Sequence, residues 1–333
     1  MVRILYTHDR AFMRKTFAAI DRHVEASSAR LALGPEASEP DGPIEELSPR
    51  VADAADYDRA VFDVDPDVVV ENHRFAAEVL DDRPEFYDSY PVVHVRHGAS
   101  VGRGEVENTT RDLADHVDVA LAPGEWWAER YRAGFPDSVR VSVVGIPEAD
   151  ALVGADAPRR RRLLYAPTNH NYGGGSYVRT ADRVLDAVAG TAFELRFRPH
   201  PADRREEPGR TVTARCMRRI EAMSNVTVDD ETSPRESLRW ADLLISDYSG
   251  IVTEWLHTGR PLVQLTDVVA DRPVPALGYR TDRLSSPALE RVYEEGYRSE
   301  VADEVDRRLE TLGIPMDGRA GERAAAEVMA CTQ

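Results

Sequence analysis

Cysteine, lysine and long apolar runs are nearly absent from this chain of 333 residues. The two cysteines, Cys216 and Cys331, form no Cys-x-x-Cys pair, which argues against a structural zinc site or a disulfide framework. The nine histidines form no His-Glu-x-x-His sequence and no metal-spaced cluster, so we expect no metal ion and no cofactor. Because no stretch of about 18 apolar residues occurs, a transmembrane helix is excluded. Charge interrupts the N-terminal segment too early for a signal peptide, and we expect a cytoplasmic protein.

The charge balance is strongly acidic, with a formal net charge of −17. Of the 42 basic residues only Lys15 is a lysine, a composition typical of proteins from salt-loving organisms. In such proteins surface carboxylates hold hydrated cations, and salt screens the repulsion between them. The alternative is that the acidity serves to repel nucleic acid. Under either interpretation the sequence contains no basic stripe, so we do not expect DNA or RNA as a partner.

Short apolar runs alternate with longer amphipathic ones, which predicts an α/β protein with parallel sheets. A segment rich in Pro, Glu and Ser, residues 33–49, is predicted to be a loop. Helices are predicted at residues 9–23, 75–80, 177–189 and 321–331. Strands are predicted at residues 3–6, 67–71, 91–96, 117–122, 139–144, 163–166, 193–197, 226–228, 243–246 and 262–264.

The two halves of the chain have similar patterns, which predicts two facing Rossmann-like domains with a cleft between them. We expect an N-terminal domain at residues 1–153 that binds the acceptor and a second domain at residues 154–315 that binds a donor nucleotide. Residues 316–333 are expected to form a helix that returns to the first domain.

The most informative motif is the Asp-Tyr-Ser-Gly sequence at 247–250, which follows a predicted buried strand and begins a predicted helix. Free backbone N–H groups at a helix start favour a diphosphate, and the Ser249 hydroxyl adds a donor. Gly250 would let a phosphate approach without a Cβ, and Glu254 could accept both hydroxyls of a ribose. The alternative is that Ser249 is an ordinary N-cap of an ordinary helix.

The second motif is Arg-Pro-His-Pro at 198–201, at the end of a predicted strand. Its two prolines restrict the loop around His200. Arg198 and His200 are therefore candidates to contact the same donor phosphates. The alternative is a surface Arg198 and a His200 that caps a neighbouring helix.

The third motif is His97-Gly98, at a strand end in the first half. Gly98 permits a close approach, and a histidine there suits removal of a proton from an acceptor hydroxyl at neutral pH. A non-catalytic role for His97 is the alternative, and His94, within the predicted strand, is expected to lie in the core.

The fourth motif is a polar, glycine-rich loop at 167–176 between a predicted strand and a predicted helix. Thr168, Asn169 and His170 are candidates for contact with a phosphate or the acceptor. The loop has neither the spacing nor the lysine of a Walker A sequence. A flexible glycine hinge is the alternative.

Taken in order, these segments resemble the CDP-glycerol glycerophosphotransferases, the family that includes teichoic-acid polymerases. The resemblance spans roughly residues 90–265. The matching pieces are His97-Gly98, residues 121–125, residues 144–150, Tyr-Ala-Pro-Thr at 165–168, Arg-Pro-His-Pro at 198–201, residues 242–254 and Gly-Arg-Pro at 259–261.

The resemblance implies a GT-B fold and a metal-independent transfer of a polyol phosphate, such as glycerophosphate, in the synthesis of a cell-surface polymer or glycan. It implies a CDP-activated donor, whereas the other functions considered below would use a UDP-linked donor. The expected acceptor is lipid-linked or a glycan, and a lipid-linked acceptor is compatible with peripheral association at the inner face of the cell membrane. Residue by residue, it assigns the base to His97, the donor phosphates to Arg198, His200, Ser249 and Gly250, and the ribose to Glu254.

The chain departs from the family pattern mainly near the expected acceptor side. Arg96 and Ala99 replace the Trp and Thr that flank the family's His-Gly, and Gly250 replaces a serine. Asn169 and His170 stand where the family tends to have an aromatic residue and an arginine. The identity of the acceptor is therefore the least constrained part of the resemblance.

Two other functions fit parts of the sequence. A UDP-sugar glycosyltransferase or a UDP-N-acetylglucosamine 2-epimerase shares the fold, and the epimerases have a similar Asp-Ser-Gly-Gly-Ile…Glu sequence. The carboxylate of their His-x-Glu-Ala-Gly sequence is absent here, because Arg96 occupies that position. A non-catalytic nucleotide-sugar binding protein of the same fold is the third possibility.

Overall fold

The chain folds into two compact α/β units. The computed structural model describes residues 2–10, 13–33, 45–47, 51–72, 74–96, 98–102, 105–154, 159–171, 175–231, 233–268, 273–296 and 298–333. One unit comprises Met1–His97, Glu105–Ala151 and Leu312–Gln333, and the other comprises Gly98–Gly104 and Leu152–Thr311. The short segment Gly98–Gly104, expected within the first domain, thus clusters with the second unit.

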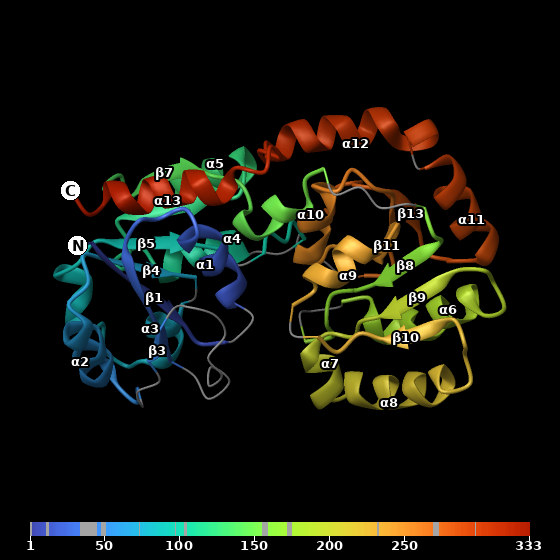
Figure 1. Cartoon of the computed structure of the whole chain (residues 1–333), viewed down its shortest axis with the longest axis horizontal. Helices are drawn as coiled ribbons and strands as arrows, with labels where there is room; N and C mark the ends of the chain where they lie inside the picture. Colours follow the sequence, from blue (N-terminus) through green and yellow to red (C-terminus); the bar gives the residue numbers. More distant parts are fainter. Residues whose placement is uncertain are drawn as a thin grey trace. The chain divides into compact units, whose positions relative to one another are not determined.

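The first unit contains a seven-stranded parallel sheet in the order β3-β2-β1-β4-β5-β6-β7 (Figure 1). Its strands are β1 (Arg3–His8), β2 (Ser27–Ala32), β3 (Glu45–Leu47), β4 (Val68–Glu71), β5 (Val92–Val95), β6 (Val119–Ala122) and β7 (Arg140–Val143). Its helices are α1 (Arg14–Asp21), α2 (Ala54–Val64), α3 (Phe75–Val79), α4 (Glu105–Asp112), α5 (Glu125–Gly134) and α13 (Ala320–Ala330), with 3-10 turns at Glu85–Asp88 and Pro147–Leu152.

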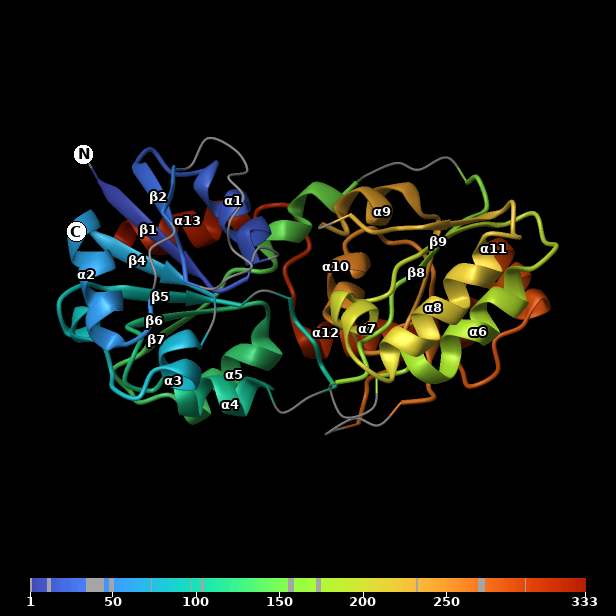
Figure 2. The same ribbon diagram turned by 90° about the horizontal axis from the view of Figure 1, so that it is seen from below.

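The C-terminal helix α13 packs in the first unit, beside α1 (Figures 1 and 2). Its Ala324 and Val328 join a core that includes Ile4 of β1 and Phe17 of α1. The Asp150 carboxylate accepts hydrogen bonds from the amides of Ala320 and Gly321, at 3.0 and 2.7 Å. Such a carboxylate satisfies amides that a helix start leaves without intrahelical partners.

The second unit contains a six-stranded parallel sheet in the order β10-β9-β8-β11-β12-β13. Its strands are β8 (Arg162–Tyr165), β9 (Glu194–Phe197), β10 (Val226–Val228), β11 (Leu243–Ser246), β12 (Leu262–Leu265) and β13 (Tyr279–Thr281). Its helices are α6 (Tyr177–Val188), α7 (Pro201–Arg205), α8 (Gly209–Ile220), α9 (Arg235–Trp240), α10 (Gly250–Leu256), α11 (Ser286–Glu295) and α12 (Arg298–Leu312).

The second sheet is buried on both faces, which explains why its central strands are continuous apolar runs. Every residue of β11 is fully buried. Leu163 and Ile245 of the sheet pack with Leu185 of α6 and Leu289 of α11 in one core. Strand order reverses between β8 and β11 in this sheet and between β1 and β4 in the other. Ligands of open α/β sheets bind at the carboxyl ends of strands at such a reversal.

The predicted fold class is confirmed, but the sequence prediction missed three strands. It omitted β2 and β13, whose sequences contain exposed or charged positions, and it placed β3 within a loop. Residues 34–44 and 48–49 of that predicted loop lie outside the described residues. The helix predicted from Asp9 begins at Arg14 instead, because β1 continues to His8 and pairs with Ala32 of β2. Among the described residues, no helix is both long and apolar enough to cross a membrane.

Candidate functional site

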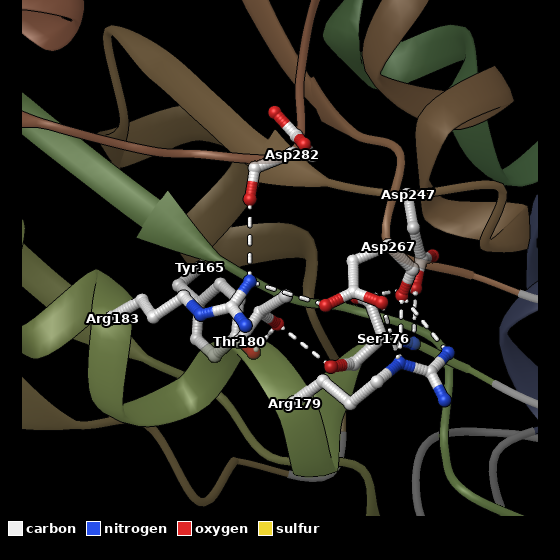
Figure 3. Close-up of polar contacts among 8 residues, drawn as sticks. All are labelled: Tyr165, Ser176, Arg179, Thr180, Arg183, Asp247, Asp267 and Asp282. Atoms are coloured by element: carbon white, nitrogen blue, oxygen red, sulfur yellow. Dashed lines mark hydrogen bonds and ion pairs between the residues drawn. The ribbon is translucent and has the colours of Figure 1, made fainter.

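Asp247, directly after β11, links the two strands at the reversal of the second sheet. It is buried, and its carboxylate accepts hydrogen bonds from the Thr168 amide and hydroxyl at 3.0 and 2.7 Å. It also accepts from the Ser176 amide and hydroxyl at 3.0 and 2.7 Å (Figure 3). The amides of Tyr248 and Ser249 donate to the same carboxylate at 2.7 and 3.0 Å. One side chain therefore fixes residues on both sides of the glycine-rich loop to the start of α10.

The arginines at the start of α6 are bound within the protein. The Arg179 and Arg183 side chains form ion pairs with Asp267, which follows β12, at 2.9 and 3.1 Å (Figure 3). Arg183 also donates to the carbonyl of Asp282 at 3.2 Å. These contacts hold α6 to the loops that follow β12 and β13.

Ser249 occupies the N-cap position of α10, yet its side chain makes no capping hydrogen bond. The alternative that the Ser249 hydroxyl is an ordinary cap therefore finds no support. The amides of Tyr248 and Ser249, which precede the helix, donate to Asp247. A Cβ on Gly250 would lie 3.4 Å from the Ala99 amide nitrogen and 3.5 Å from the Gly98 Cα. The sequence predicts a phosphate beside Gly250, and the structure places the backbone of residues 98 and 99 next to the position of the missing Cβ.

The segment of residues 98–102 lies against the start of α10. The Ser100 hydroxyl donates to the Tyr248 carbonyl at 3.0 Å, and a Cβ on Gly102 would lie 2.6 Å from the Tyr248 ring. Gly98 has φ +70°, a left-handed conformation that favours glycine. The backbone conformation at Gly98 therefore explains why this motif has a glycine. His97 itself lies outside the described residues, as do residues 172–174 of the glycine-rich loop.

The Arg198 guanidinium binds other residues of the protein, whereas the sequence predicts that it binds a phosphate. It donates to the Asp229 carboxylate at 2.9 Å and to the Glu231 carbonyl at 2.7 Å, and its side chain is 13% exposed. Arg204 lies beside it and donates to the carbonyl oxygens of Pro199 and Asp229 at 3.3 and 2.5 Å. Burial, and then the charge of Arg198, lower the pKa of Arg204. Arg204 is not among the residues predicted from the sequence, where its only signal is its place soon after the motif.

His200 caps α7, the short helix that it begins, rather than a neighbouring helix. Its ring Nδ1 accepts a hydrogen bond from the Ala202 amide at 3.1 Å, and Pro201 occupies the first helical position. A nitrogen that accepts from an amide carries no proton, so the neutral ring carries its proton on Nε2. His200 can therefore cap α7 through Nδ1 and offer an N–H donor through Nε2.

His170 points toward α7. Its Nδ1 lies 2.5 Å from Asp203 Oδ1, which also accepts from the His170 amide at 3.1 Å. The His170 side chain is 8% exposed and that of Asp203 is fully buried. Burial raises the pKa of the Asp203 carboxyl, and the bond to His170 opposes this rise. Thr168 and Asn169 are also buried, so all three candidates in this loop make mainly internal contacts.

The candidate for the ribose, Glu254, lies on α10 and is buried, between Thr253 and Trp255, which are also buried. In the first unit the corresponding strand edge contains Glu71, in register with Thr7 of β1 and His94 of β5. Glu71 is fully buried and accepts a hydrogen bond from the Tyr87 hydroxyl at 3.0 Å, and burial raises its pKa to about 8. In the described part of the chain, no group of three or more potential metal ligands is found.

Comparisons with solved structures identify the class of fold. The wall teichoic acid polymerase TagF superposes with a TM-score of 0.70 and 13% identity, over 99% of this chain and 88% of that one. A Listeria monocytogenes protein described as a UDP-N-acetylglucosamine 2-epimerase gives 0.69 and 16%, over 99% and 96%. The UDP-GlcNAc 2-epimerase of Neisseria meningitidis, solved with UDP-GlcNAc, gives 0.59 and 14%, over 99% of both chains. The chain therefore has the two-unit GT-B fold.

The family follows from the sequence. The model of the CDP-Glycerol:Poly(glycerophosphate) glycerophosphotransferase family matches residues 67–268, and the chain belongs to this family of transferases. The match includes Thr168, Arg198, His200 and the start of α10. No curated protein is similar enough in sequence to match the chain.

Proposed function

We propose that the protein transfers glycerophosphate from CDP-glycerol to a hydroxyl acceptor, without a metal ion, in the synthesis of a cell-surface polymer or glycan. The family match over residues 67–268 is the observation that carries this proposal. A TagF variant has been solved after a soak with CDPG, which supports a CDP-linked donor for a protein of this fold.

The donor diphosphate is proposed to bind at the start of α10. The Asp247 carboxylate already occupies the amides of Tyr248 and Ser249, so the later amides of the first turn and the Ser249 hydroxyl are the donors left for a phosphate. Glu254, about one helical turn further on, is proposed to accept the ribose hydroxyls. His200 is proposed to add its Nε2–H, and Arg198, although paired with Asp229, is proposed to lie close to the phosphates together with Arg204.

The reaction requires a base for the acceptor hydroxyl and a hydrogen-bond donor for the leaving group. The acceptor oxygen attacks the phosphorus that carries glycerol, the bond to the bridging oxygen breaks, and CMP leaves with that electron pair. His97 is proposed to take the proton of the acceptor hydroxyl, a step that typically contributes about 10²–10⁴-fold to the rate. His200, which donates through Nε2, is proposed to stabilise the negative charge on the departing CMP. The acceptor is proposed to be a lipid-linked or glycan hydroxyl, with the enzyme peripheral to the membrane.

A ligand screen at high salt tests the donor. A ligand at 100 times its dissociation constant stabilises the folded state by about 2.7 kcal/mol, enough to raise the melting temperature measurably. We expect CDP-glycerol to stabilise the protein and to release CMP when acceptors are added. Stabilisation by UDP-N-acetylglucosamine but not by CDP-glycerol would favour the epimerase or glycosyltransferase alternative. Donor binding without CMP release across a broad set of acceptors would favour a binding protein.

A further inference from the structure

The His170–Asp203 pair joins two segments that belong to different motifs. His170 belongs to the segment of residues 168–171 after β8, and Asp203 lies in α7, three positions after His200. Asp203 Oδ1 binds both the ring Nδ1 and the backbone amide of His170, at 2.5 and 3.1 Å. Two bonds to one buried oxygen fix the backbone of residue 170 as well as its ring.

The surroundings leave little freedom to this pair. A Cβ on Gly209, at the start of α8, would lie 2.6 Å from His170 Nδ1 and 2.6 Å from the Asp203 Cα. The Thr213 hydroxyl of α8 donates to the Asp203 carbonyl at 2.8 Å. The pair is therefore packed into the corner between α7 and α8, where only a glycine at position 209 leaves room for it.

The same segment is held at its other end by Asp247. Thr168 binds that carboxylate through its amide and its hydroxyl. Residues 168–171 therefore connect Asp247, which fixes the start of α10, to Asp203, which lies in the helix capped by His200. These contacts form a continuous chain between the two elements to which the proposed function assigns the donor phosphates.

The ring of His170 is not placed to touch a donor itself. Its Nε2 is buried and has no hydrogen-bond partner among the described residues. Only Nδ1 is used, and its partner is internal. An imidazole that is committed through Nδ1 and covered at Nε2 acts on other residues rather than on a ligand.

We infer that His170 and Asp203 are positioning residues of the donor site, whose bond sets the place of α7 and His200 relative to Asp247 and the start of α10. This inference rests on the proposed function for its effect on CDP-glycerol. The bond itself, and its effect on the order of the two segments, do not depend on the donor.

Substitutions at residue 170 separate positioning from direct contact. In His170→Asn the side-chain amide can donate to Asp203 much as imidazole Nδ1 does, but Nε2 is lost. In His170→Ala both are lost. Gly209→Ala displaces the pair without removing either side chain. Asp182→Asn is the matched control, because Asp182 of α6 pairs with Arg215 and Arg219 of α8 in the same unit, away from residues 168–171.

Two measurements are made on each variant: the dissociation constant of CDP-glycerol by calorimetry, and amide hydrogen exchange without ligand over residues 168–171 and 201–205. We expect His170→Ala and Gly209→Ala to weaken CDP-glycerol binding about tenfold or more, the scale of one charge-assisted hydrogen bond. Both should exchange faster in the two segments. His170→Asn and Asp182→Asn should remain near the parent in both measurements.

Two results would overturn the inference. If His170→Asn binds as weakly as His170→Ala, Nε2 contacts the donor and the role is not positioning. If His170→Ala leaves exchange over residues 201–205 unchanged, the pair does not hold α7. A parent protein that fails to bind CDP-glycerol would contradict the proposed function instead, and the exchange measurement would still decide whether the pair holds α7.

Discussion

The Asp247 carboxylate accepts a 2.7 Å hydrogen bond from the hydroxyl of Thr168, a residue 79 positions earlier in the chain. The contact joins the carboxyl ends of β8 and β11, the neighbouring strands between which the sheet order reverses. Because the carboxylate also holds two amides at the start of α10, the phosphate-binding geometry proposed there depends on Asp247.

Asp247→Asn should destabilise the second unit. The carboxylate only accepts hydrogen bonds, whereas an asparagine would present an N–H₂ group to some of the donors from Thr168, Ser176 and the helix start. Leaving buried donors unsatisfied costs about 1–3 kcal/mol. Urea unfolding at constant high salt measures the change, with Ser249→Ala as the control, since its hydroxyl caps nothing. Equal stability of Asp247→Asn and the parent would show that the network is redundant.

Ser249→Ala and Glu254→Ala should weaken donor binding by about tenfold or more, because each removes hydrogen bonds to a charged or polyhydroxylated group. Ser249→Ala should affect CDP-glycerol and inorganic pyrophosphate alike. Glu254→Ala should affect CDP-glycerol more than pyrophosphate, which has no ribose. Competition calorimetry with both ligands distinguishes the two roles. Unchanged affinity for CDP and UDP donors in both variants would remove the start of α10 from the donor site.

His200 and His97 should respond differently to substitution. His200→Asn keeps an acceptor for the Ala202 amide but loses the Nε2 donor, whereas His200→Ala loses both. We expect His200→Asn to retain the stability of the parent and His200→Ala to lose about 0.5–2 kcal/mol, the usual effect of removing a cap. Both should bind CDP-glycerol more weakly and turn over slowly. Normal turnover by His200→Asn would show that His200 is only a cap.

For His97→Ala, turnover should be abolished while CDP-glycerol binding stays nearly intact, because the proposed role of His97 concerns the acceptor. The parent should lose activity on the acid side of its pH profile, as a general base becomes protonated. CMP release with an identified acceptor, together with donor calorimetry, measures both effects. Full turnover by this variant would end the assignment and direct attention to other bases.

The sequence predicted best what depends on neighbouring residues. The run Leu243–Ser246 is a buried strand because all its residues are apolar or small, and the strand followed by Asp-Tyr-Ser-Gly places the start of α10. The run Ser27–Ala32 was missed because it begins with two serines and contains Arg30, although Arg30 is buried in the structure.

Contacts between distant segments could not be read from the sequence. Each motif was expected at a strand end, but which strands are neighbours depends on sheet order, so the bond between Asp247 and Thr168 was not foreseen. His170 was a candidate for ligand contact, and only tertiary structure shows its ring turned to Asp203. Likewise, nothing local to the motif indicates that Asp229 lies beside Arg198. The sequence alone therefore predicted that Arg198 binds a phosphate.

Glu71 predicts a pH effect on stability in the first unit. Its folded pKa of about 8 lies above its ordinary value of 4.5, so the contribution of this group is complete below about pH 4.5 and is lost as the pH rises toward 8. Glu71→Gln resembles the protonated side chain and does not titrate. Its stability relative to the parent should therefore increase between pH 5 and pH 8. Urea unfolding at both pH values measures this, with exposed Glu129→Gln as the control. A difference independent of pH would contradict the buried, protonated state.

The net charge of −17 predicts that the protein loses stability at low ionic strength. Unscreened repulsion among like charges opposes the compact state, and the screening length grows from about 3 Å at 1 M salt to about 30 Å at 0.01 M. Surface ion pairs such as Arg215–Asp182 strengthen at low salt and act in the opposite direction, but exposed pairs contribute only about 0–1 kcal/mol each. We therefore expect the melting temperature to fall as potassium chloride decreases from molar to tens of millimolar.

Sucrose at matched osmolality provides the control, because it favours the compact state by exclusion from the surface without screening charge. If charge repulsion is the cause, sucrose should not restore the melting temperature lost at low salt to the extent that potassium chloride does. A melting temperature that is flat across this range, or that sucrose restores equally well, would contradict the prediction. In that case the carboxylates would already be neutralised by internal arginine pairs, and the acidic composition would need another physical explanation.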